Sequence, residues 1–114
     1  MLQVHGTADI AVNYDGATPP DTGAYPGAAT SVATWAGYDG CRARSLDTAG
    51  TVDFDSALPG EETVLTRFDG CPDGIGLELW TVQGGSHNPD IRFADGSRPL
   101  SVGIIEWLFA HPKP

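Results

Sequence analysis

The sequence predicts an α/β fold built from about three to four short strands and two helices. Residues 2–6 (LQVHG) form a short apolar run of the kind found in buried parallel strands. Two later segments, 62–68 and 76–82, alternate from one residue to the next, as strands with two different faces do. Segments 29–38 and 101–110 repeat apolar residues at helical spacing. The resulting order of strand, helix, strand, strand and helix is typical of an α/β domain.

The first helix is predicted from Ala29 to Tyr38, with Thr30 or Ser31 as its N-cap and Gly40 as its stop. Its apolar stripe consists of Val32, Trp35 and Ala36. The second helix is predicted from Ser101 to Ala110 and ends before Pro112, which cannot continue a helix. Its stripe consists of Ile104, Trp107 and Leu108, with Ile105 and Phe109 beside it.

The strands 62–68 and 76–82 are separated by DGCPDGIG, a run of turn residues that predicts a β-hairpin or a bulged connection. Residues 7–29 are predicted to be a long loop, and long loops are often functional. The stretch 42–61 is predicted to be polar and irregular. Within it, DFD (53–55) is interpreted as a solvated turn rather than a metal site.

The composition favours one loop-rich domain, and its negative charge disfavours binding to nucleic acid or anionic membranes. The chain has 114 residues, with 15 glycines and 9 prolines. Fifteen acidic residues against six Lys and Arg give a net charge of −9. Such a surface repels nucleic acid and anionic membranes, whereas a neutral polymer or a small ester is not repelled.

The first residues, MLQVHGTADI, show neither the basic stretch nor the apolar run of a signal peptide, and no segment is apolar enough to span a membrane. We therefore expect a mature chain, a fragment or a cytosolic protein. Because a strand-like run follows Met1 directly, we also expect that the chain begins inside a larger domain.

Two cysteines, Cys41 and Cys71, each follow the residues Asp-Gly. They allow one intramolecular pairing, and a disulfide would close a loop of about 30 residues and stabilise the fold by roughly 3–4 kcal/mol. It would also imply an oxidising compartment. The alternative is two free thiols, while a zinc site needs more ligands than two distant cysteines.

Asp9 and His87 form the candidate catalytic pair. Asp9 lies just after the first predicted strand, in HGTAD, and His87 lies just after the third, in GGSH. If these two strands run parallel, both loops leave the sheet at the same rim, where α/β proteins place their sites. The carboxylate then accepts the imidazole N–H and fixes the tautomer of the histidine. The alternative is an aspartate that caps its own turn and a solvated histidine.

The segments LQVHGTAD, TWAGYDGC, RFDGC, ELWTVQGGSH and WLFAHPKP together resemble the C-terminal part of secreted α/β-hydrolase esterases of the polyhydroxybutyrate depolymerase and feruloyl esterase group. The resemblance covers nearly all of this chain but only about the last third of a family domain. It implies that Asp9 is the triad acid and His87 the triad base, that Cys41 and Cys71 form a disulfide, and that the protein is secreted. Gly84 and Gly85 would let the backbone turn so that the imidazole faces the nucleophile.

The nucleophile of such a triad is missing from the chain. Members of this group carry it upstream, in a G-x-S-x-G turn. No serine here has glycines at that spacing: Ser31, Ser45, Ser56, Ser86, Ser97 and Ser101. The oxyanion-hole segment is also upstream in the group. Ser86, beside His87, is a weak substitute, because adjacent residues on an extended loop point apart.

Several other aromatic and histidine residues are candidates for packing or binding roles. Tyr14 and Tyr25, in the long loop after Asp9, are the candidates for substrate contact, with surface packing as the alternative. His5 is expected to be a packed residue of its strand, and His111 a surface residue near a helix C-terminus. A zinc site from His5, Asp9 and His87 lacks any recognised ligand spacing. The tryptophans are expected to be mainly core anchors: Trp35, Trp80 and Trp107.

Two functions from different classes follow. The first is part of a serine esterase that acts on polyesters, feruloylated polysaccharides or short acyl esters and needs no cofactor or metal. The second is an inactive relic of such an enzyme that folds as an oligomer or binds a ligand. In both cases the strand 2–6 is left with an open edge, so we expect a homo-oligomer paired through residues 2–5 or a complementing N-terminal fragment.

Overall fold

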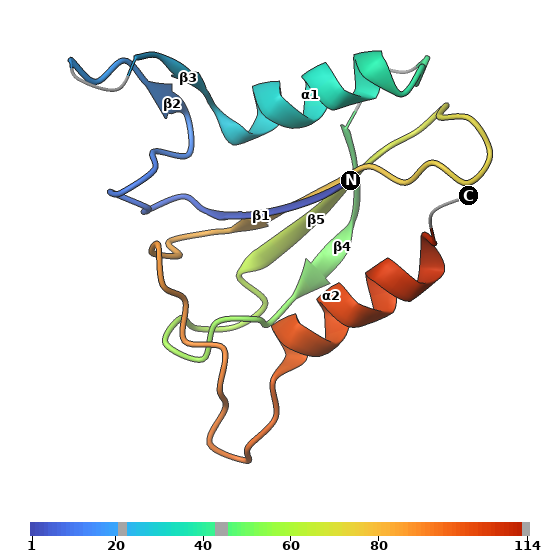
Figure 1. The fold of residues 1–114 in the computed structure, drawn as a ribbon. Helices are drawn as coiled ribbons and strands as arrows, with labels where there is room; N and C mark the ends of the chain where they lie inside the picture. The colour runs from blue at the N-terminus through green and yellow to red at the C-terminus, as the bar shows by residue number, and fades with distance from the viewer. Residues whose placement is uncertain (21–22, 43–45, 113–114) are drawn as a thin grey trace.

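The computed structural model describes residues 1–20, 23–42 and 46–112, and these form a mixed α/β domain (Figure 1). Its elements in chain order are β1 (Leu2–Gly6), β2 (Gly16–Ala17), β3 (Tyr25–Pro26), α1 (Ala28–Tyr38), β4 (Leu46–Val52), β5 (Thr63–Phe68), β6 (Glu78–Val82) and α2 (Pro99–Ala110). The α/β prediction and its two helices are therefore confirmed. Among the described residues, no helix is both long and apolar enough to cross a membrane.

One four-stranded sheet has the order β1-β6-β5-β4. β1 and β6 run parallel, with Leu2 opposite Glu78 and Gly6 opposite Val82. β6 pairs antiparallel with β5, as the predicted hairpin requires, and β5 pairs antiparallel with β4. Since β1 and β6 are parallel and in register, the loops after Gly6 and Val82 leave the sheet side by side. In the part of the chain that the structure describes, the outer edge of β1 pairs with no strand.

The sheet lies between the two helices, with α1 over one face and α2 over the other (Figure 1). Alternate residues of β6 divide between the faces: Leu79 packs with Val32 of α1, and Trp80 packs with Leu100 of α2 and with Phe54. Leu79 and Val32 are almost fully buried. Burial of an aliphatic side chain of this size stabilises a fold by about 1.5–3 kcal/mol, so these contacts hold the helices on the sheet.

The helix starts differ from those predicted. α1 begins at Ala28 with Gly27 as its N-cap and has no side-chain cap, so the prediction of Thr30 or Ser31 was wrong. The backbone N–H of Ala28 donates to the carbonyl oxygen of Tyr14 at 2.8 Å, and this contact satisfies an end group without a hydroxyl cap. α2 begins two residues early, at Pro99, whose fixed φ suits the first helical position.

The prediction that residues 42–61 are irregular was wrong, because they contain β4 (residues 43–45 lie outside the described part). The pairing of β4 with β5 shifts between Thr48 and Gly50, and this bulge breaks the alternation that marks a strand. The long loop 7–29 likewise contains a short ribbon of β2 and β3, while residues 21–22 are outside the described part.

The segment 53–55 is not a solvated turn, since Phe54 and Asp55 are buried. The backbone N–H groups of these two residues donate to Oε1 of Glu62, at 3.0 and 3.1 Å. A carboxylate that satisfies both amides lets this turn pack under α2 instead of facing water.

Cys41 and Cys71 form a disulfide, as the resemblance implied. It joins the end of α1 to the loop between β5 and β6, and both cysteines pack against the core beneath α1. Beside it, the backbone N–H of Arg42 donates to the carbonyl oxygen of Gly70 at 2.9 Å.

Trp35 is not a core anchor, because its side chain is about half exposed and packs edge-on against Tyr38. Val32 and Ala36 take the positions that face the sheet. Trp80 is buried as expected, and Trp107 is partly buried against the core beneath α2. His111 stacks on Trp107 with ring centroids 4.2 Å apart, so it packs against the last helix and is not a fully exposed residue.

Candidate functional site

The loops after β1 and β6 are joined directly at the rim of the sheet. The backbone N–H of Thr7 donates to the carbonyl oxygen of Val82 at 2.9 Å, and that of Ala8 donates to Gly85 at 3.0 Å. The hydroxyl of Thr7 accepts from the backbone N–H of Gly84 at 2.8 Å. These bonds fix the loop that carries Asp9 against the loop that carries His87.

Glycines make this close approach possible. Gly84 has a φ of 78°, a left-handed conformation that other residues rarely adopt. A Cβ atom added to Gly6 would lie 2.1 Å from the carbonyl oxygen of Gly85, and one added to Gly85 would lie 2.5 Å from Val82 Cγ1. The glycines of HGTAD and GGSH therefore let two loops turn over each other at a distance that side chains would prevent.

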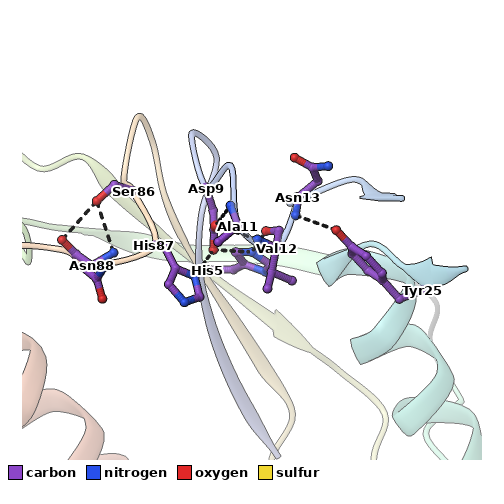
Figure 2. Close-up of polar contacts among 9 residues, drawn as sticks. All are labelled: His5, Asp9, Ala11, Val12, Asn13, Tyr25, Ser86, His87 and Asn88. Atoms are coloured by element: carbon purple, nitrogen blue, oxygen red, sulfur yellow. Dashed lines mark hydrogen bonds and ion pairs between the residues drawn. The ribbon is translucent and has the colours of Figure 1, made fainter. Parts of the chain in front are cut away.

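This packing brings Asp9 and His87 into contact. His87 Nδ1 lies 2.9 Å from Asp9 Oδ2, although the residues are 78 positions apart in the chain (Figure 2). The carboxylate is buried, with 6% of its side chain exposed, whereas 51% of the His87 side chain is exposed. The two residues selected from the sequence thus meet in the geometry expected of an acid and the base that it orients.

Two backbone amides hold the other oxygen of Asp9. Oδ1 accepts from the N–H groups of Ala11 and Val12, each at 2.9 Å. The hydrogen bond from Val12 is the largest cause that lowers the pKa of Asp9 to about 2, and the bond from His87 and that from Ala11 add to it against the opposing effect of burial. Asp9 is therefore ionised at neutral pH.

The ionised state of Asp9 decides the tautomer of His87. A carboxylate only accepts hydrogen bonds, so Nδ1 of His87 carries the proton that it donates. In the neutral imidazole, Nε2 then has a free lone pair. That nitrogen belongs to the half-exposed ring and can take a proton from a nucleophile that reaches it.

A cavity of about 280 Å³ lies beside the pair. Its volume is at the low end for a ligand site. Its lining combines residues from β1, the end of β6 and the two loops: Val4, His5, Gly6, Asp9, Val12, Val82, Ser86, His87 and Pro89.

Ser86 lines this cavity, but its hydroxyl donates to the carbonyl oxygen of Asn88 at 3.1 Å and accepts from the backbone N–H of Asn88 at 3.3 Å. Figure 2 shows it turned toward Asn88 and away from the ring of His87. Ser86 therefore shapes the loop that follows His87, and nothing in this arrangement activates it as a nucleophile.

The two candidate substrate tyrosines both take part in structural contacts. The hydroxyl of Tyr14 is bonded to Thr81 Oγ1 at 2.8 Å, and its ring packs against the core under α1. The hydroxyl of Tyr25 accepts from the backbone N–H of Asn13 at 3.0 Å. Contact of either residue with a substrate stays a prediction.

His5 is a site residue that the sequence analysis did not assign. It is a packed residue of its strand, as expected, and in addition its Nε2 lies 2.8 Å from the carbonyl oxygen of Val12 and 3.3 Å from Asp9 Oδ2. The available signal was the spacing of His5 and Asp9 within HGTAD. Two residues four positions apart are too distant to touch in a straight strand, so this spacing alone did not predict the contact. The turn at Gly6 brings them together.

Among the described residues, no group of three or more histidine, cysteine or acidic side chains is arranged to hold a metal ion. Comparisons of the chain with models of known protein families, with curated proteins and with solved structures find no match.

Proposed function

We propose that this chain supplies the acid and base of a serine carboxylic ester hydrolase, as the C-terminal segment of an α/β-hydrolase fold. The observation that carries the proposal is the contact between His87 Nδ1 and Asp9 Oδ2 at the carboxyl ends of two parallel strands. The disulfide between Cys41 and Cys71 supports a secreted protein of this group.

The proposed reaction needs a hydroxyl nucleophile that the described site does not supply. That hydroxyl attacks the ester carbonyl, and its proton passes to Nε2 of His87. The C–O bond to the leaving alkoxide then breaks, and the alkoxide takes the proton from Nε2. Water repeats the two steps and releases the acid, while Asp9 stabilises the imidazolium each time.

The nucleophile could be carried by a further strand that pairs with the open edge of β1. A strand that paired parallel with β1 would end at the same rim as Gly6 and Val82. A turn at its end would present a serine next to His87, together with backbone N–H groups for the oxyanion. Such a strand would come from a preceding segment or from another chain.

The substrate class that we propose is an uncharged ester: a polyester, a feruloylated polysaccharide or a short acyl ester. The net charge of −9 disfavours polyanions. The small cavity beside Asp9 and His87 fits an acyl end group better than a large ring system. No cofactor is needed, because the proton transfers use the imidazole alone.

The test is a chimaera in which the nucleophile-bearing N-terminal part of a related esterase precedes residues 1–114. We expect hydrolysis of p-nitrophenyl butyrate, and we expect His87→Ala and Asp9→Asn to abolish most of it. The isolated chain and the isolated N-terminal part are the controls and should stay near background. A folded chimaera without activity, or one indifferent to both substitutions, would rule the proposal out.

A second proposal concerns self-association through the edge of β1 at residues 2–5. It is favoured by that unpaired edge and by the outer surface of α2, which exposes Ile105, Leu108 and Phe109. In this reading the chain is a folded oligomeric module without activity of its own. Sedimentation velocity over a range of concentrations tests it: a dimer or larger species is expected, and a monomer at every concentration would contradict it.

A further inference from the structure

The carboxylate of Asp9 is surrounded by four nitrogen atoms. Oδ1 accepts from the backbone N–H groups of Ala11 and Val12. Oδ2 lies 2.9 Å from His87 Nδ1 and 3.3 Å from His5 Nε2 (Figure 2). An ionised carboxylate accepts about four hydrogen bonds, and three of these nitrogens make one, while His5 Nε2 is in close contact. His5 thus adds a contact to Oδ2 that a pair of Asp9 and His87 alone would not have.

The tautomer of His5 follows from its second contact. Its Nε2 lies 2.8 Å from the carbonyl oxygen of Val12, which can only accept. Nε2 therefore carries the proton and donates it to Val12, while the same nitrogen also lies 3.3 Å from Asp9 Oδ2. Because the backbone N–H of Val12 donates to Asp9 Oδ1, the residues His5, Asp9 and Val12 form a closed ring of contacts.

His5 is itself held in place. Its side chain is 13% exposed. Tyr14 meets its ring edge-on, with centroids 5.5 Å apart, and the Tyr14 hydroxyl is bonded to Thr81 of β6. Asp9 and Tyr14 are titratable groups in contact with His5. A ring fixed from both sides can hold Asp9 more firmly than a mobile surface side chain can.

We propose that His5 is a positioning residue, which keeps Oδ2 of Asp9 directed at Nδ1 of His87 and so keeps His87 in the tautomer with Nε2 free. That this positioning serves ester cleavage rests on the proposed function. The effect of His5 on the tautomer of His87, through Asp9, does not depend on it. When both imidazole rings are neutral, they carry their protons on different nitrogens: His5 on Nε2 and His87 on Nδ1.

The experiment is long-range ¹H–¹⁵N NMR of the imidazoles in the intact chain at about pH 8.5, well above the ordinary histidine pKa of about 6.5. Two substitutions form a matched pair. His5→Phe keeps a ring against Tyr14 but removes the N–H, and His5→Gln keeps an N–H donor without the ring. We expect a single Nδ1–H tautomer of His87 in the wild-type chain and in His5→Gln, and a mixture of both tautomers in His5→Phe.

The methyl signals of Val32 and Leu79 report whether each variant is folded, because both side chains are buried under α1. A folded His5→Phe chain in which His87 stays entirely Nδ1–H would overturn the proposal. If that variant does not fold, His5→Gln decides between the outcomes. A folded Gln variant with mixed tautomers of His87 would also overturn the proposal. Retention of the Nδ1–H tautomer would support the role of the N–H donor.

Asp9→Asn separates this inference from the proposed function. If the wild-type His87 is not Nδ1–H, or if Asp9→Asn leaves its tautomer unchanged, the pairing of Asp9 with His87 is wrong and the proposed function fails with it. If the His5 variants behave as expected while the chimaera shows no hydrolysis, the positioning role stands and the esterase proposal alone is rejected.

Discussion

Asp9 and Asp53 carry the same carboxyl group, and their surroundings shift its pKa in opposite directions. Asp9 faces two backbone amides and two imidazoles, and its pKa is lowered to about 2. At Asp53 the pKa is raised, first by burial and then by the nearby carboxylate of Glu62. The comparison teaches that burial raises the pKa of both carboxyl groups, and that at Asp9 the hydrogen bonds to the carboxylate outweigh this effect.

The hydrogen bonds at the two sites explain the difference. Every oxygen of Asp9 has N–H donors beside it. Near Asp53, Oδ1 of Asp53 and Oε2 of Glu62 are both buried without a hydrogen-bond partner among the described residues. Glu62 uses its other oxygen for the amides of Phe54 and Asp55 and the hydroxyl of Thr63. The first arrangement suits an acid that orients a base, and the second suits a structural acid that closes a turn.

The largest effect is expected at the acid of the pair. Asp9→Asn keeps an oxygen for the amides of Ala11 and Val12 but cannot hold His87 as a charged acceptor. In the active chimaera we expect kcat for p-nitrophenyl butyrate to fall by roughly four powers of ten, as expected when a triad histidine is left in the wrong tautomer. A fall of less than tenfold would show that Asp9 does not act on the base.

Glu62→Ala should damage the fold more than the site. It leaves the buried N–H groups of Phe54 and Asp55 without their acceptor, and each unpaired group costs about 1–3 kcal/mol. Urea unfolding at pH 7 measures the loss. Glu61→Ala is the matched control, because Glu61 contacts the exposed hydroxyl of Thr51, and its substitution should change stability by at most about 0.5 kcal/mol.

The acid sensitivity of the fold should depend on Asp9. A carboxyl whose pKa is lower in the folded state contributes stability above its unfolded value of 3.8 and loses it as pH falls toward about 2. Unfolding free energies measured between pH 5 and pH 2 should therefore fall less steeply for Asp9→Asn than for the wild type. Parallel curves for the two proteins would contradict the low pKa of Asp9.

Asp53→Asn should have the smallest effect, and in the opposite direction. Because the folded state raises the pKa of Asp53, ionisation weakens the fold as pH rises through that value. The neutral amide removes this loss and can donate to Glu62, so the variant should be modestly more stable at pH 7. The gain should disappear below about pH 4, where the aspartate is protonated in both states. Thermal melts at pH 7 and pH 3.5 provide the check.

Much of this fold could be predicted because apolar spacing reports directly on burial. The alternation in 62–68 and 76–82 predicted strands with two different faces, and in the structure Phe68 and Leu79 pack in one core while Leu65 and Trp80 pack in the other. β4 could not be found in the same way, because it is an outer strand with a bulge near Gly50. Its pairing depends on β5, which local sequence does not reveal.

Part of the site could also be predicted from the sequence. Asp9 and His87 could be paired because both follow strand-like runs, and parallel strands end at one rim. The contact of His5 with Asp9 could not be predicted, since it depends on how sharply the chain turns between Gly6 and Asp9. The burial of Asp55 could not be predicted either, because it requires a partner, Glu62, that lies just before β5.

The central claim, that Asp9 is held ionised by its donors and acts on His87, is tested most directly by ¹³C NMR titration of the Asp9 carboxyl carbon. The account predicts a midpoint at about pH 2 in the wild-type chain, and a higher midpoint in His87→Ala, because one hydrogen bond to the carboxylate is lost. A midpoint near the ordinary value of 3.8 that does not move in His87→Ala would contradict it.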